Sequence, residues 1–126
     1  MILDSGFYLY SEVIEISGAG GVNTAALTVP VGELWEVKHL VGSHDDASAR
    51  NCFWTFDDGV TTYQLAESLS IATNIRDQFY ERIHLMGPLI LRHGLVLSWV
   101  VSSIGGGQVA TLRGLVYKLR GLPLEE

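Results

Sequence analysis

Charged residues are scarce in this chain of 126 residues: they make up 17% of it, against 48% for the hydrophobic residues. A single domain of this length usually needs more polar cover, because small domains have a large surface for their volume. Either the chain is β-rich and tightly packed, or other subunits cover part of its apolar surface. We favour the second interpretation.

Lysine is also rare, since only Lys38 and Lys118 stand against six arginines. Protein interfaces favour arginine over lysine, although codon bias would give the same composition. The net charge is −6 and no cluster of basic residues occurs, so we expect neither a nucleic-acid partner nor a basic membrane surface. The longest apolar run, near residues 95–101, is far shorter than a membrane span.

A single cysteine, Cys52, excludes an internal disulfide framework. It stands among aromatic residues and is expected to be a small buried apolar side chain rather than a catalytic thiol. The first residues carry no basic region before the apolar ones, so we expect no signal peptide. We therefore expect synthesis and folding in a reducing cytoplasm.

What the sequence has is a period of two, interrupted by glycine and proline. Asp57, Asp58 and Gly59 form a strong hairpin signal between two strand-like segments. The pattern predicts an all-β protein, an antiparallel β-sandwich of about eight strands. The expected strands are 11–17, 24–29, 33–41, 51–56, 60–65, 87–91, 95–102 and 109–120.

Residues 66–86 give a weaker signal. We expect a loop or turn followed by a strand, with one short helix as the alternative. In that alternative Asn74 caps the helix, and Ile75, Phe79 and Ile83 share one of its faces.

The polar stretch around His39 raises the question of a site. Alternation places His39 on the same face as Trp35, where a histidine is usually hydrogen-bonded in a packed setting. His44, Asp45 and Asp46 follow in an expected solvated turn. Their spacing fits neither a calcium loop nor a zinc site, and the metal-barrel pattern of two histidines one residue apart is missing.

Other catalytic signals are missing too. The glycine-rich segments lack a following helix and lysine, and no serine stands in a nucleophile elbow. We expect no enzyme activity, no cofactor and no bound metal. Trp35, Trp54 and Trp99 fall in expected strands and are predicted to be core residues rather than a sugar-stacking platform.

We divide the chain into an N-terminal arm or edge strand at 1–10, a single sandwich domain at 11–122 and a C-terminal tail at 123–126. Phe7, Tyr8 and Tyr10 are the candidate assembly residues of the arm.

The strands and their corners resemble a known family. The segments are VPVGELWEVKHLVG, NCFWTFDDG, GPLILRHGLVLSWVV and VATLRGLVYKL, within residues 24–120. Together they are similar to the small, jelly-roll-like β-sandwich virion proteins of tailed bacteriophages, such as capsid decoration (cement) proteins. Gly32 and Gly94 take the place of the two glycine corners, while Arg92 and His93 depart from the expected Pro-Pro or Pro-Ala.

The resemblance implies a non-enzymatic structural protein of the virion, made in the host cytoplasm. It implies a homo-oligomer, most simply a trimer, that contacts the major capsid protein or other virion proteins. The alternatives are a head–tail connector, tail or fibre component, and a carbohydrate- or receptor-binding module. A metal-dependent jelly-roll enzyme would require His39, His84 and His93 to converge. The sequence leaves the position in the virion and any ligand open.

Overall fold

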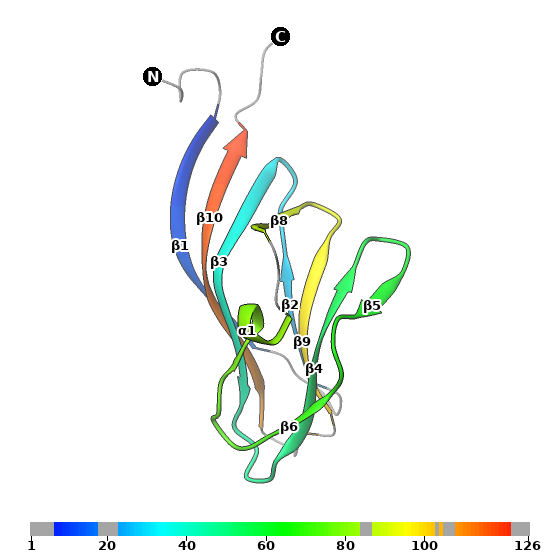
Figure 1. Ribbon diagram of the computed structural model, residues 1–126. Helices are drawn as coiled ribbons and strands as arrows, with labels where there is room; N and C mark the ends of the chain where they lie inside the picture. Colours follow the sequence, from blue (N-terminus) through cyan, green and yellow to red (C-terminus); the bar gives the residue numbers. More distant parts are fainter. Residues whose placement is uncertain (1–6, 18–22, 84–86, 103, 105–107, 122–126) are drawn as a thin grey trace.

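The protein is a sandwich of two antiparallel β-sheets (Figure 1). The computed structural model describes residues 7–17, 23–83, 87–102, 104 and 108–121. Sheet A has the order β1 (Phe7–Ser17), β10 (Ala110–Gly121), β3 (Glu33–His44) and β7 (Asp77–Gln78), with β8 (Leu89–Arg92) also paired to β3. Sheet B has the order β2 (Asn23–Thr28), β9 (Val96–Val101), β4 (Arg50–Asp57) and β5 (Thr62–Gln64), with β6 (Leu69–Ile71) also paired to β4.

The predicted all-β antiparallel sandwich is confirmed. The described residues form ten strands rather than about eight, and the two additional ones are the short strands β6 and β7, of three and two residues. The predicted hairpin is present, since β4 pairs with β5 across the turn that contains Gly59. Among the described residues, no helix combines the length and the apolar character needed to cross a membrane.

The uncertain segment 66–86 holds the short strands β6 and β7 and the short helix α1 (Phe79–Ile83). The helix that we kept as the alternative is therefore present, and the strand that we expected at FYERIHL is wrong for residues 79–83. The helix forms because Phe79 and Ile83, four residues apart, both pack on the core. The ring of Phe79 meets that of Trp54 edge to face at 5.1 Å. Asn74 does not cap the helix. It lies in a turn with φ of 60°, and Ile75 is exposed.

The core between the sheets is built around two indole rings. Trp54 of β4 and Trp99 of β9 are fully buried, with ring centroids 4.8 Å apart. The indole of Trp99 reaches across to sheet A and donates a hydrogen bond to the carbonyl oxygen of Ser43 at 3.0 Å. Gly42 leaves room for this ring, because a Cβ atom there would lie 2.2 Å from it.

A β-bulge in β3 changes which residues face the core. Leu115 of β10 is opposite His39, but Val116 is opposite Val37, so Lys38 is an extra residue without a partner position. The alternation changes phase there, and His39 becomes exposed. Our expectation that His39 shares the buried face is therefore wrong. Gly114 accommodates the bulge, because a Cβ on it would lie 2.3 Å from the carbonyl oxygen of His39.

Gly32 and Gly94 each lie in a turn that leads from one sheet to the other. Gly32 (φ 88°) connects β2 to β3, and Gly94 (φ 97°) connects β8 to β9. Each is the third residue of a turn closed by a backbone hydrogen bond, a position that requires positive φ in a type II turn. Nδ1 of His93 lies 3.1 Å from the carbonyl oxygen of Val29, so this histidine joins the two turns.

Candidate functional site

The polar stretch at the end of β3 makes structural contacts that join β3 to β6. Nε2 of His44 donates to the carbonyl oxygen of Ile71 at 2.7 Å, and Nδ1 accepts from the backbone N–H of Asp46 at 3.1 Å. Both ring nitrogens are thus occupied by backbone groups. His44 and Asp46 are buried, so the solvated turn that we expected is wrong for them, while Asp45 is exposed. Beyond the bulge, the even-numbered residues of β3 face the core, and His44 is one of them.

The structure does not bring the candidate metal-binding histidines together. His39 lies on the outer face of sheet A, whereas His93 lies at the turn beside Val29. His84 lies outside the described residues. Within the described part of the chain, no group of three or more histidine, cysteine, aspartate or glutamate side chains is arranged to hold a metal ion.

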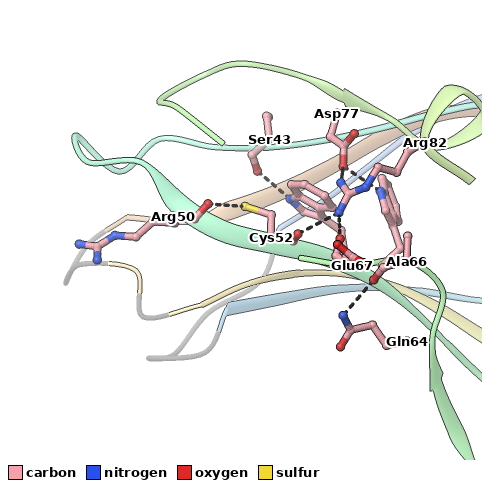
Figure 2. Close-up of polar contacts among 10 residues, drawn as sticks. Ser43, Arg50, Cys52, Gln64, Ala66, Glu67, Asp77 and Arg82 are labelled. Atoms are coloured by element: carbon pink, nitrogen blue, oxygen red, sulfur yellow. Dashed lines mark hydrogen bonds and ion pairs between the residues drawn. The ribbon is translucent and has the colours of Figure 1, made fainter. Parts of the chain in front are cut away.

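The most concentrated polar cluster joins the two sheets through Arg82 of α1 (Figure 2). Its guanidinium pairs with the carboxylate of Asp77 in β7 and donates to the carbonyl oxygens of Cys52 and Glu67. Asp77 also accepts from the indole N–H of Trp54 at 3.2 Å. The side chains of Asp77 and Arg82 are only 10% and 9% exposed. Every partner of this pair is a structural group, so the cluster fixes α1 and β7 against sheet B.

No sequence pattern predicts this ion pair, because Asp77 and Arg82 are five residues apart in the segment with the weakest pattern. That spacing does not place two side chains side by side on a regular helix. The pair meets because β7 ends where α1 begins.

Cys52 lies beside this cluster and is not a nucleophile. Burial raises the pKa of its thiol to about 12, and the negative charge of Asp77 adds to the rise in pKa while Arg82 opposes it. The Sγ atom donates to the carbonyl oxygen of Arg50 at 3.3 Å. A thiol with such a pKa stays protonated at neutral pH, and the thiolate is the reactive form.

The three tryptophans are core residues, as predicted. Trp54 and Trp99 are completely buried and Trp35 is 6% exposed. The indole of Trp35 donates to the carboxylate of Glu33 at 2.6 Å, and the ammonium group of Lys118 lies 4.1 Å from its ring centroid. None of the three offers a ring face for stacking on a sugar.

The candidate assembly element is β1. It pairs with β10 over eleven positions without a register shift, and it stands at the end of sheet A. Phe7, Tyr8 and Tyr10 are part of this strand, at the positions opposite Gly121, Arg120 and Lys118. Within the described residues, no strand pairs with the other edge of β1.

An apolar strip lies on the outer face of sheet A, beside this edge. Ile90 of β8 and Tyr117 of β10 stand on either side of Glu36 in the register, and Leu34 follows two positions along β3 on the same face. Leu34, Ile90 and Tyr117 are 42%, 52% and 36% exposed. The ammonium group of Lys38 lies 5.3 Å from the centroid of the Tyr117 ring. Tyr117, at the end of the strip nearest to β1, lies on β10, so only β1 itself stands between the strip and the free edge of the sheet.

No protein-family model and no curated protein sequence matches the chain. Among solved structures, a chain from the infectious bursal disease virus Gx strain is similar to it with a TM-score of 0.40 and 13% identity. That match covers 94% of this chain but 33% of the viral one, so this chain spans about a third of the viral chain's length.

Two polysaccharide-binding modules are also similar. The CBM22-1 xylan-binding domain from Paenibacillus barcinonensis Xyn10C has a TM-score of 0.36 and 12% identity, over 94% of this chain and 87% of that one. The mannan-binding module from Man5C has a TM-score of 0.29 and 18% identity, over 87% and 82%. These similarities are ones of β-sandwich fold alone.

Proposed function

We propose that this protein is a structural subunit of a tailed-bacteriophage particle. It assembles as a homo-oligomer on the capsid surface and stabilises the particle through contacts between subunits and with the capsid protein. The observation that carries this proposal is the edge strand β1, which is eleven residues long and paired along one side. The phage assignment itself comes from the resemblance of the strand and corner pattern.

An edge strand offers a row of backbone donors and acceptors to any other strand. Natural proteins protect such edges with lysine, proline, bulges or very short strands. The β1 sequence, FYLYSEVIEIS, contains no lysine, arginine, proline or glycine, its charged residues are Glu12 and Glu15 alone, and its pairing has no bulge. At about 3.4 Å per residue the edge extends for roughly 37 Å, which is long enough for a partner strand to add to sheet A.

The apolar strip supports the same conclusion. Tyr117 of β10 lies one strand in from the edge at which a partner strand would add, and Leu34 and Ile90 lie further in, on β3 and β8, so a partner that covers all three also extends over the outer face of sheet A. Covering Leu34, Ile90 and Tyr117 would remove apolar surface from water, at about 25 cal/mol per Å² of that surface. This burial accounts for the low proportion of charged residues in the chain.

The test is the mass of the full-length protein in solution, measured by light scattering, against two deletions. Removing residues 1–10 takes away four of the eleven positions that pair in β1, while removing residues 1–6 leaves all eleven. We expect a closed oligomer, most simply a trimer, for the full chain and for the shorter deletion. The longer deletion should shift the protein towards monomer and keep the far-UV circular dichroism of a folded sandwich.

A monomeric full-length protein, or an unchanged oligomer after removal of residues 1–10, would contradict the edge-strand proposal. The place on the particle needs a second experiment, the binding of the purified oligomer to capsids that lack it. Binding to isolated tails or connectors instead would move the protein to those parts of the virion.

A further inference from the structure

The outer face of sheet A has a second feature, a depression of about 310 Å³. One row of the sheet there consists of Gln78, Val41 and Arg113, and His39 lies on the neighbouring row opposite Leu115. The bulge at Lys38 places His39 on this face. Bulges often re-aim a side chain beside a binding site. The depression thus has a structural cause other than loose packing.

The rim of the depression is cationic. Arg76 and Arg113 supply guanidinium groups, and His39 and Gln78 add further N–H donors. None of the described lining residues is acidic, although the whole chain has a net charge of −6. Asp77 follows Arg76 directly, but its carboxylate is engaged by Arg82 and Trp54. The carboxylate nearest to Arg76 in the sequence is therefore already occupied.

The floor of the depression is apolar. Val41 is only 7% exposed, and Leu115 beside it is partly buried. Glu15 stands opposite Arg113 in the register, so the positive charge that we assign to the site is that of Arg76, with Arg113 at its edge and His39 as a further N–H donor.

We propose that this depression binds an organic carboxylate. The carboxylate accepts hydrogen bonds from Arg76 and His39. The planar guanidinium of an arginine can donate two parallel hydrogen bonds to the two oxygens of a carboxylate. The aliphatic part of the ligand lies on Val41 and Leu115. An inorganic anion would meet the same donors without using the floor. This proposal does not depend on the oligomeric state or on the role in the virion.

The experiment is a titration of the full-length, isotopically labelled protein, followed by amide NMR shifts at constant ionic strength. Acetate, hexanoate and inorganic phosphate are the three probes. We expect saturable shifts at His39, Gln78 and Leu115, with hexanoate binding at least tenfold more tightly than acetate, since each buried methylene contributes about fourfold. Phosphate should bind no more tightly than acetate.

Substitutions then assign the binding to the depression. Arg76→Met and His39→Met, which leave no N–H donor on the side chain, should each weaken hexanoate binding about tenfold, the effect of losing a hydrogen bond to a charged group. Both residues are exposed, so the fold should be unaffected. Arg92→Met, at an exposed arginine of β8 outside the lining, is the matched control and should change nothing. Non-saturable shifts, tighter binding of phosphate than of hexanoate, or equal loss in the control would each overturn the proposal.

Discussion

Removing the cation of the buried ion pair should destabilise the protein strongly. In Arg82→Met the apolar stem is kept, but Asp77 loses its ionic partner at 10% exposure, where solvent screens little of its charge. The carbonyl oxygens of Cys52 and Glu67 also lose a donor. Breaking one partner of a buried ion pair costs about 3–5 kcal/mol, a large part of the roughly 5–15 kcal/mol that stabilises a typical domain.

The double variant separates the orphaned charge from the lost packing. Asp77→Asn removes the charge and keeps an oxygen that can accept from the indole of Trp54. Added to Arg82→Met, it should therefore restore about 1–2 kcal/mol of the lost free energy of unfolding, within the coupling expected for groups in direct contact. The assay is urea unfolding followed by tryptophan fluorescence and circular dichroism.

The exposed pair of Lys38 and Glu36 gives the matched control. Their side chains are 42% and 36% exposed, so Lys38→Met should change the free energy of unfolding by less than about 1 kcal/mol. If the Asp77→Asn and Arg82→Met losses simply add, or if Arg82→Met matches the control, the two side chains are not coupled and our description of the cluster is wrong.

Two further predictions concern the core and the hairpin. Gly42→Ala places a methyl group 2.2 Å from a buried indole and should cost about 1–3 kcal/mol, lowering the melting temperature by several degrees, while Gly87→Ala, with open space around it, should not. In the hairpin, the pKa of Asp57 is lowered by the Thr62 hydroxyl, and the pKa of Asp58 is lowered by backbone amides of the turn. The two carboxylates therefore contribute their full stabilisation of the hairpin above about pH 4, and this contribution is lost as the pH falls through the lowered pKa values. Carboxyl carbon shifts measured from about pH 2 to 6 check this, and titration at or above the ordinary value of 3.8 would contradict it.

The parts of the fold that the sequence predicts are those with local signals. The turn at Gly59 and the alternation along β10 need no distant partner to be recognised. The helix α1 was harder, because a five-residue helix is stable only through packing, here of Phe79 against Trp54. A pattern in sequence contains no record of that contact.

The candidate sites were harder still, because they depend on the register of the strands. Two consecutive polar residues, Lys38 and His39, between Val37 and Leu40 are the trace that the bulge leaves in the sequence. The same sequence is compatible with a regular strand that exposes one valine or leucine. Alternation alone therefore cannot distinguish a bulged strand from a regular one. Arg76 and Arg113 come to the same depression only because β3 pairs with β7 on one side and β10 on the other.

The bulge at Lys38 determines the inner and outer faces of β3 together. If Lys38 instead took a regular place in the ladder, without the bulge, side chains beyond Val37 would exchange faces, since a shift of one residue inverts the alternation of a strand. His44 would leave its two backbone partners, and Gly42 would no longer stand beneath the indole of Trp99. The bulge therefore keeps Gly42 and His44 on the core side although the strand has one residue more than its partner, and it turns His39 towards the depression on the outer face.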